Sequence, residues 1–304
     1  MKLKFNNEVR GAAKNNQPIV ALESTIISHG LPYPDNLEVA KSLQEAVREK
    51  GAIPATIAIL GGEVHIGLTD EALAMLADPN SRIEKASRRD IPHLLASGGN
   101  GATTVAATML LAQKAGISVF ATGGIGGVHR GAETSFDISA DLPELARTDM
   151  CVVCAGPKAI LDIGLTMEVL ETSGVPVIGY QCDEIPAFWS RNGSGVEVPL
   201  RLDRPDDIAS LLNQKWQAGL DGGVLVANPV PASAEIPAAE LKTAIDAALQ
   251  QAEQKGVKGK AVTPFLLDYI RTHTSGRSLA ANKALVLNNA RLAAEIAMAY
   301  HRQK

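Results

Sequence analysis

The chain has 304 residues, of which 46% are hydrophobic and 20% charged, and its formal net charge is −4. This composition is typical of a globular protein with enough apolar residues for a large core. The net charge provides no basic field that would attract nucleic acid or an anionic membrane surface. No apolar run approaches the roughly 20 residues that a membrane-spanning helix needs, and the N-terminal residues lack the apolar region of a secretory signal. We therefore expect a cytoplasmic protein without nucleic-acid or membrane partners.

The N-terminal half alternates short apolar runs, which predict strands, with longer helical patterns. In chain order we expect a strand at 18–26, a helix at 34–51, a strand at 54–60 that turns at Gly61 and Gly62 into a second strand at 63–68, a helix capped by Thr69 at 69–77, a helix at 101–116 and a strand at 117–122. The glycine pair favours a hairpin between the second and third of these strands.

The C-terminal half continues the alternation and then becomes helical. We expect strands at 149–156 and 175–180 with a helix between them that ends near Ser173, an edge strand at 196–202, a helix at 205–219, a strand at 222–230, and helices at about 237–255, 263–273 and 278–302. The edge position follows from Pro199, which has no backbone N–H to donate to a second neighbour.

This alternation predicts an α/β fold with three layers, α/β/α, around a mixed and largely parallel central sheet. No Pro-, Ser- or Gly-rich linker divides the sequence, so we expect one catalytic domain over residues 1–304. In such sheets, ligands bind at the carboxyl ends of the strands. The most unusual residues of the sequence fall at those ends.

Cys151 and Cys154 form a CxxC pattern, but the pattern lies inside a predicted strand. Residues three apart in a strand point to opposite faces of the sheet, whereas a redox CxxC begins a helix. We interpret both cysteines as buried packing residues.

Glu23 stands in the otherwise apolar segment "IVALESTIISHG". A carboxylate in such a place is costly unless it is paired or hydrogen-bonded. It is therefore either a structural residue held by backbone donors or a lysine, or a general acid whose pKa is raised by desolvation.

Two neighbouring segments are suited to an anion. "EKASRRD" (84–90) collects Lys85, Arg88 and Arg89, which form either a solvated surface or an anion-binding cluster. "ASGGNGATTVAAT" (96–108) follows, and its glycines are predicted to open a helix whose N–H groups suit phosphate. It lacks the Lys-Ser/Thr pair of a nucleotide triphosphate loop.

The segment 117–142 contains "GGIGG" and then "FDISADL". The glycine spacing is a weak fit to a dinucleotide fingerprint. Asp137, Ser139 and Asp141 are spaced by two, so in an extended loop their oxygens can face one side, which suits Mg²⁺ or Mn²⁺. The alternative is that Ser139 or Asp141 merely caps the next helix.

Lys158 follows Pro157 directly after a predicted strand, so we place it at a helix N-terminus. The helix dipole disfavours a cation there, which would lower the pKa of a partly desolvated lysine and make it a better nucleophile. An ordinary lysine that extends to solvent is the alternative. Together with Glu23 and the two anion- and metal-suited segments, Lys158 suggests imine chemistry on a phosphorylated sugar.

The contiguous motifs "ALESTIISHGLPYP", "GGNGATTVAATM", "FATGGIGGVHRGAETSFDISADL", "VVCAGPKAILDIGLT", "LVANPVP" and "TPFLL" resemble the pseudouridine-5′-phosphate glycosidase family, which is similar in fold to the indigoidine synthase A type. The resemblance covers the chain from about residue 8 to its C-terminus. It implies a homotrimeric lyase, of the carbon–oxygen class and acting as a C-glycosidase, that reversibly converts pseudouridine 5′-phosphate and water to uracil and ribose 5-phosphate. It also implies a Mn²⁺ cofactor.

The resemblance assigns roles to individual residues of this sequence. Lys158 matches the family's nucleophile, which forms an imine at ribose C1′, and Glu23 matches its proton donor. Asp137 matches the Mn²⁺ ligand. Residues that match substrate-binding positions are Lys85, Val105, Ser139, Ala140, Asp141 and Asn282. The segment 191–202 cannot be matched closely to the family, and Pro157 stands where a small residue is common.

The residues alone leave three alternatives open. A class I aldolase-like lyase, or a C-glycosidase for another base, would use the same parts. A phosphosugar-binding protein without catalysis would need neither Lys158 nor Glu23, and both are present. A ribokinase-like sugar kinase also carries Gly-rich loops, but no catalytic base of a kinase-type anion hole can be recognised.

Overall fold

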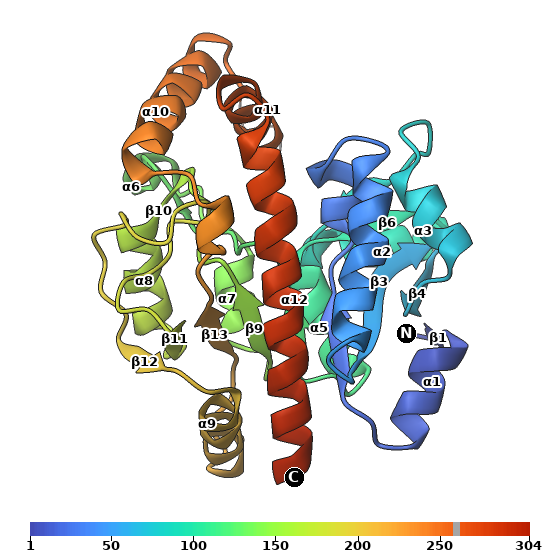
Figure 1. Cartoon of the computed structure of the whole chain (residues 1–304). Helices are drawn as coiled ribbons and strands as arrows, with labels where there is room; N and C mark the ends of the chain where they lie inside the picture. Colours follow the sequence, from blue (N-terminus) through green and yellow to red (C-terminus); the bar gives the residue numbers. More distant parts are fainter. Residues whose placement is uncertain (258–261) are drawn as a thin grey trace.

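The structure, a computed structural model, describes residues 1–257 and 262–304. An 11-stranded sheet runs through its centre with helices on both faces (Figure 1). Its strands are β1 (Leu3–Phe5), β2 (Ile19–Leu22), β3 (Ile53–Leu60), β4 (Glu63–Ile66), β5 (Glu84–Ala86), β6 (Gly101–Thr103), β7 (Val119–Ala121), β9 (Cys151–Cys154), β11 (Val177–Tyr180), β12 (Leu200–Leu202) and β13 (Val224–Ala227). Two further strands, β8 (Val128–His129) and β10 (Leu161–Asp162), pair antiparallel with each other.

Helices connect most of these strands. They are α1 (Asn7–Lys14), η1 (Ile26–Gly30), α2 (Asp35–Arg48), α3 (Asp70–Ala77), η2 (Arg88–Asp90), α4 (Ile91–Ser97), α5 (Val105–Lys114), α6 (Ala132–Ser135), α7 (Asp141–Leu145), α8 (Ile163–Thr172), α9 (Pro205–Gln217), η3 (Ala232–Ala234), α10 (Ala238–Gln254), α11 (Val262–His273) and α12 (Arg277–Gln303). The three closing helices begin and end within one or two residues of the predicted bounds.

The sheet is mixed and largely parallel, as predicted. Neighbouring strands in the order β3, β2, β7, β9, β13, β11, β12 all pair in parallel. Strands β4 and β6 pair antiparallel with β3, and the β3–β4 hairpin turns at Gly61 and Gly62. The strand ends that follow β2, β7 and β9 therefore lie side by side.

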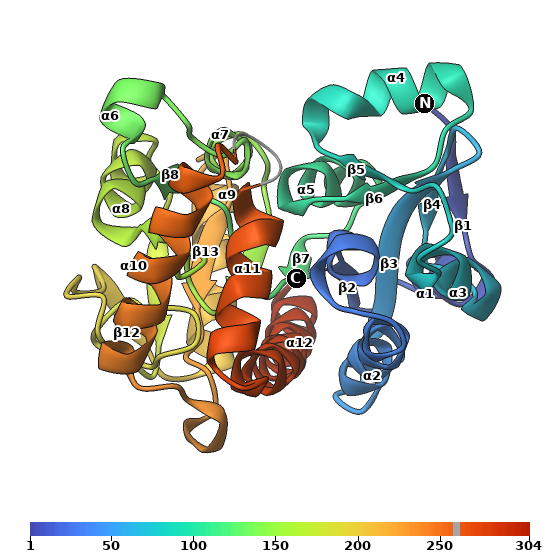
Figure 2. The same ribbon diagram turned by 90° about the horizontal axis from the view of Figure 1, so that it is seen from above.

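Strand β9 shows how the sheet separates two apolar cores. Cys151 packs in a cluster with residues of α2, α9 and α12, whereas Cys154 packs in a cluster with residues of α1, α5 and α8. Figure 2 shows α2 and α12 on one side of β2 and β3, and α5 on the other. The three-layer α/β/α prediction is confirmed. Both thiols are buried, which raises the pKa of Cys154 to about 12 and that of Cys151 further, so the packing interpretation of the CxxC pattern is also confirmed.

The long helix α12 crosses the centre of the molecule (Figure 1). It contacts α2, α9, α11 and η3 as well as the strands β2, β7 and β9. It thereby lies across the middle strands of the sheet, and it brings Asn282 and Asn289 toward the strand ends.

Three predicted boundaries are wrong. The first strand ends at Leu22 rather than at residue 26, because a π-helical turn begins at Ile26. Residues 101–103 form β6 against β3, and helix α5 begins only after Thr104, whose hydroxyl accepts from the N–H of Ala107. The edge strand shrinks to β12, which pairs only with β11 among the described residues and begins after Pro199.

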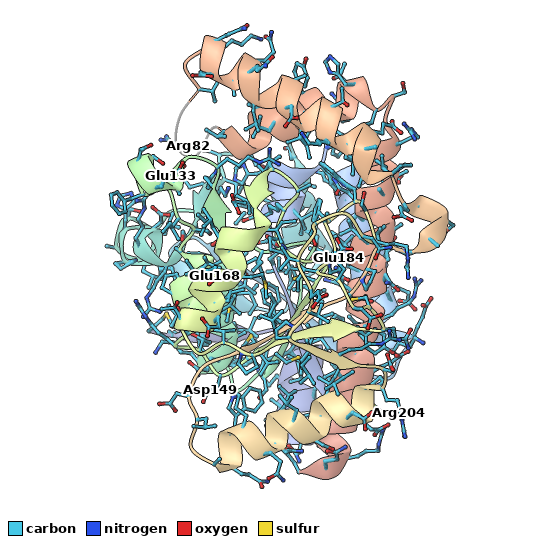
Figure 3. All side chains as sticks on the ribbon, turned by 90° about the vertical axis from the view of Figure 1, so that its left-hand side faces the viewer. Arg82, Glu133, Asp149, Glu168, Glu184 and Arg204 are labelled. Atoms are coloured by element: carbon cyan, nitrogen blue, oxygen red, sulfur yellow. The ribbon has the colours of Figure 1, made fainter. Side chains whose placement is uncertain are left out.

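The outer surface carries charges of both signs. In the side view of Figure 3, Arg82 and Glu133 lie near one end of the molecule, and Asp149 and Arg204 lie near the other. None of the helices in the described ranges combines the length and the apolar character that crossing a bilayer requires.

Candidate active site

Three adjacent strand ends bring the predicted acid and the predicted nucleophile together. Glu23 directly follows β2, and Lys158 lies four residues after β9. Strand β7 lies between them and is parallel to both, so all three point their carboxyl ends to the same edge of the sheet. The positive charge of Lys158 acts directly on the carboxyl group of Glu23.

The backbone after Glu23 is anchored by buried hydroxyl groups. Ser24 Oγ donates to the carbonyl oxygen of Ile57 at 2.7 Å and accepts from the N–H of Thr103 at 2.8 Å. Thr25 Oγ1 donates to the carbonyl oxygen of Ala102 at 3.3 Å. Because Ser24 and Thr25 are fixed to β3 and β6, Glu23 is held at one position at the end of β2.

The carboxyl group of Glu23 lies in a desolvated environment. Burial raises its pKa, against the lowering effects of the Lys158 charge and of a hydrogen bond from Thr122 Oγ1. A raised pKa keeps more of the carboxyl protonated near neutral pH, which is the state that a general acid needs.

The prediction that Lys158 begins a helix is wrong. Helix α8 begins at Ile163, five residues later, and Asp162 caps it by accepting from the N–H of Leu165 at 2.9 Å. Pro157 forms a parallel bridge with Ile125, and the N–H of Lys158 donates to the Ile125 carbonyl oxygen at 3.1 Å. Lys158 therefore lies in a loop that extends the sheet, and a helix dipole does not act on it.

The glycines after β7 allow a second loop to approach. A Cβ on Gly126 would lie 2.2 Å from Ser139 Oγ and 2.8 Å from Asp141 Oδ2. The N–H of Gly126 donates to Asp141 Oδ2 at 2.7 Å, and the N–H of Ala106 donates to Asp141 Oδ1 at 3.0 Å. Both carboxylate oxygens of Asp141 thus accept hydrogen bonds from backbone N–H groups, which connects the glycine loop to the start of α5.

A cavity of about 770 Å³ opens between these loops. The predicted site residues that line it are Glu23, Lys85, Val105, Asp137, Ser139, Ala140, Asp141 and Lys158. Arg88 and Arg89 line it too, so the cationic segment 84–90 faces the cavity rather than only solvent. Sequence reasoning considered these two arginines but did not assign them to the site.

Arg88 is oriented by a buried carboxylate. Its Nη1 donates to both oxygens of Glu144, at 2.7 and 2.6 Å, and Glu144 is 1% exposed. Thr148 donates to the same carboxylate at 2.6 Å. Neither Glu144 nor Thr148 could be associated with the site from the sequence, because the contact to Arg88 joins segments 56 residues apart.

A smaller and more apolar cavity of about 90 Å³ shares lining residues with the larger one. Both side chains line it, together with Phe188, Val286 and Asn282. Asn282 also accepts a hydrogen bond from Trp189 Nε1 at 2.7 Å. Sequence reasoning did not find Phe188, which has a backbone φ of 62° and comes from the 181–199 connection.

The predicted metal ligand, Asp137, is exposed at the rim of the larger cavity. Across the described ranges, no three His, Cys, Asp or Glu side chains gather in an arrangement that would hold a metal ion. A carboxylate at the rim of a cavity lined by Lys85, Arg88 and Arg89 fits a hard divalent cation that keeps most of its waters and shares a substrate phosphate, as Mg²⁺-type sites often do. The site does not fit a closed cage of protein ligands.

Comparison with known proteins identifies the family. A family model described as indigoidine synthase A like protein matches residues 8–299. The chain belongs to the indigoidine synthase A-like family. The resemblance that the sequence motifs indicated is thereby confirmed.

Relatives within and around this family are close over almost their full length. The pseudouridine-5′-phosphate glycosidase of Solibacter usitatus is 59% identical over 297 residues, which are 98% of this chain and 99% of the relative. The protein of the same name from Escherichia coli is 55% identical over 300 residues, with 99% and 96% covered.

Two solved structures share the fold. The prealnumycin C-glycosynthase AlnA, in complex with ribulose 5-phosphate, has a TM-score of 0.91 and 41% identity, and the match covers 99% of this chain and 97% of that one. An indigoidine synthase A-like protein from Thermotoga maritima has a TM-score of 0.88 and 36% identity, with the same coverage.

Proposed function

We propose that this protein is a pseudouridine-5′-phosphate glycosidase, a lyase that reversibly breaks the carbon–carbon bond between uracil C5 and ribose C1′. The observation that carries the proposal is the place of Glu23 and Lys158, which line both a wide cavity with several cationic side chains and a narrow, mostly apolar one. A ribose phosphate suits the wide cavity with its cationic side chains, and a planar base suits the narrow one. The reacting C1′ would then lie where the two cavities meet. The names of relatives that are 55–60% identical support the same reaction.

The chemistry follows from the fact that carbon is a poor leaving group. Departure of the base through an oxocarbenium ion would leave negative charge on uracil C5. Lys158 avoids this if its Nζ bonds to C1′ as the C1′–O4′ bond breaks and O4′ takes up a proton. The nitrogen lone pair then forms a C=N bond as the C1′–C5 bond breaks, and uracil C5 receives a proton.

In this proposal Glu23 supplies the proton to uracil C5. Water then adds to the imine and releases ribose 5-phosphate, which returns Lys158 to its free amine. Burial of Glu23 suits the first step, because it favours the protonated carboxyl group.

Around these two residues, the proposal assigns substrate binding to Lys85, Val105, Ser139, Ala140 and Asp141 in the wide cavity and to Asn282 in the narrow one. Asp137 would hold Mn²⁺, which supplies positive charge beside the phosphate of the substrate. In the same proposal the protein acts in the cytoplasm as a homotrimer. Phe136 and Ile138, which flank Asp137, are 81% and 43% exposed, and cover by a second copy would explain such exposure.

The deciding experiment mixes uracil, ribose 5-phosphate and Mn²⁺ with the purified protein and follows the formation of pseudouridine 5′-phosphate by chromatography and mass spectrometry. We expect product with Mn²⁺ and none in excess chelator. Full activity in excess chelator would show that the reaction does not need a metal ion held by Asp137. Condensation of the sugar phosphate with another carbon acceptor, and not with uracil, would instead indicate a C-glycosynthase such as the structural neighbour.

A further inference from the structure

A chain of buried polar groups extends from Glu23 into the core of the protein. Thr122 Oγ1 donates to Glu23 Oε1. Asn289 Nδ2 donates to the carbonyl oxygen of Thr122 at 2.9 Å, and Asn228 Nδ2 donates to Asn289 Oδ1 at 3.0 Å. Thr122, Asn228 and Asn289 are at most 4% exposed. The carboxyl group is therefore connected through Thr122, which follows β7, to α12 and to the end of β13.

This chain stands where apolar residues would be expected. Asn289 occupies the buried face of α12, whose neighbours Leu285, Val286 and Ala290 belong to the apolar core. A buried amide contributes little to stability even when it is fully hydrogen-bonded, and an apolar side chain of similar size avoids its desolvation cost. A core built only for stability would not need Asn289. Its hydrogen bonds therefore indicate that the position of Thr122 has to be fixed.

The backbone of Thr122 is fixed from both sides. Its N–H donates to the Val153 carbonyl oxygen at 3.0 Å, which continues the β7–β9 pairing, while Asn289 holds its carbonyl oxygen. The next carbonyl, that of Gly123, accepts from the N–H of Ala155 at 2.9 Å. Thr122 itself is not among the described residues that line either cavity, so it reaches the substrate only through Glu23.

A hydroxyl group has a single hydrogen to donate, and Thr122 donates it to Glu23 Oε1. The oxygen of a carboxylic acid that accepts best is the one without the proton. The contact therefore favours the proton on Oε2.

We propose that Thr122 is a positioning residue that fixes the rotation of the Glu23 carboxyl group and places its acid proton on Oε2. The proposal rests on the assignment of Glu23 as the acid of the proposed function. It adds that the direction in which the acid delivers its proton is set by a hydroxyl outside the substrate cavities. The backbone carbonyl of that threonine is in turn held by the buried amide of Asn289 in α12, which accepts from Asn228 directly after β13.

The test uses the pH dependence of kcat, because a packing role would not change it. An acid must be protonated, so kcat falls as pH rises through the pKa of Glu23. The Thr122 hydrogen bond stabilises the carboxylate and lowers this pKa. The other groups that act on Glu23 are Lys158, Lys85 and Asp141, with His29 on the facing turn η1, and all four are the same in each variant.

Thr122→Val keeps the shape of the side chain and removes the hydroxyl, whereas Thr122→Ser keeps the hydroxyl. For Thr122→Val we expect kcat for cleavage of pseudouridine 5′-phosphate to fall about 10- to 100-fold. Its KM should stay within about threefold, and the alkaline limb of its kcat profile should move to higher pH. Thr122→Ser should keep the limb and stay within about threefold of wild type, because it can make the same hydrogen bond.

Thr56→Val is the matched control. It also removes a buried threonine hydroxyl, one that accepts from Gln44 Nε2 at 3.2 Å, and Thr56 is not among the described residues that line the two cavities. It should leave kcat unchanged, as well as the pH at which kcat falls on the alkaline side. Equal losses in Thr122→Val and Thr122→Ser, or a limb that stays in place in Thr122→Val, would overturn the proposal.

A second measurement separates this inference from the proposed function. Side-chain carbon NMR on protein with ¹³C-labelled glutamate titrates Glu23 without substrate, and the Glu23→Gln variant identifies its signal. We expect a higher Glu23 pKa in Thr122→Val than in wild type or Thr122→Ser. If wild-type protein fails to cleave pseudouridine 5′-phosphate, the proposed function fails while the titration still decides whether Thr122 governs Glu23. An unchanged titration in an active enzyme overturns only the inference.

Discussion

If Glu23 is the acid of the proposed function, function and stability oppose each other at this residue. Burial raises its pKa above the ordinary value of 4.5, so the folded protein keeps the proton to higher pH than the unfolded chain does. Between 4.5 and the folded pKa, and above it, ionisation therefore favours the unfolded state. A protein selected only for stability would carry a neutral side chain here.

Glu23→Gln should therefore stabilise the protein at neutral pH while it removes activity. We expect the melting temperature to rise by about 2–4 °C for each kcal/mol of relieved burial cost. The difference from wild type should shrink as pH falls from the folded pKa of Glu23 toward 4.5, and it should be absent below 4.5, where both states are protonated. Differential scanning calorimetry across pH measures this, and an equal or lower melting temperature at neutral pH would show that Glu23 is a structural carboxylate.

The same variant should slow the reaction much more than it weakens binding. If Glu23 donates a proton, kcat should fall about 10²- to 10⁴-fold, whereas the Kd for ribose 5-phosphate should change by less than about threefold. Steady-state kinetics and calorimetric titration give the two numbers. Comparable losses in both would argue against proton donation.

Lys158 does not lie at a helix end, and its proposed role rests on its place beside Glu23 in the lining of both cavities. If it forms an imine with ribose 5-phosphate, borohydride should reduce the adduct and mass spectrometry should locate it on residue 158. Lys158→Arg keeps the charge but cannot form the imine, so it should give no adduct and no activity. Lys114→Arg at the end of α5 should behave like wild type, because Lys114 is not among the described residues that line the cavities. An adduct at another lysine would contradict the proposed nucleophile.

At the scale of elements, the glycine loop after β7 is held against the segment 137–141, which follows α6. Gly126 in the first loop and Asp141 at the start of α7 are joined by a hydrogen bond of 2.7 Å, and Ser139 packs against the glycine. The segment that carries Asp137 is thus positioned by a close backbone approach, and that approach requires the absence of a side chain at residue 126.

Gly126→Ala should displace this segment. Its Cβ would meet Ser139 Oγ at 2.2 Å, so the loop that carries residues 137–141 must move. We expect KM for pseudouridine 5′-phosphate to rise about tenfold, which corresponds to about 1.4 kcal/mol, and the Mn²⁺ concentration for half-maximal activity to rise with it. Gly11→Ala in α1, where a Cβ meets nothing within 4 Å, serves as the control and should leave both values unchanged. Wild-type kinetics in Gly126→Ala would show that the loop's position is not required.

At the scale of the whole molecule, α12 lies across the middle strands of the sheet. It packs on β2 and β7 and on β9, and it contacts both α2 and α9. Continuous pairing from β3 to β12 adds to this, so neither end of the sheet has a complete core of its own.

We therefore predict that the chain unfolds as one cooperative unit, as a single domain should. In urea, the fluorescence of Trp189 and Trp216, which lie on the β11–β13 side, should change at the same concentration as the far-UV circular dichroism of the whole chain. Two separated transitions would show that the two ends of the sheet unfold independently.

Much of this fold was predictable because its signals are local. Strand–helix alternation, the Gly61–Gly62 hairpin and the three C-terminal helices each follow from residues within a few positions of one another. The boundaries at Leu22 and Thr103 were missed because they depend on partners: Ser24 and Thr103 bond to Ile57 of β3, which no local pattern indicates.

The sequence by itself determined the α/β class, the family and the residues that were assigned to the site, because long contiguous motifs and strand periodicity are local features of the sequence. Only the tertiary structure decided how those residues are used. In the structure Lys158 lies outside any helix, and both oxygens of Asp141 accept from backbone N–H groups. Glu23 is connected through Thr122 to Asn289, which is 167 residues away from that threonine. Burial and electrostatic coupling act through space, so the environment of an acid or a nucleophile becomes defined only when distant segments pack around it.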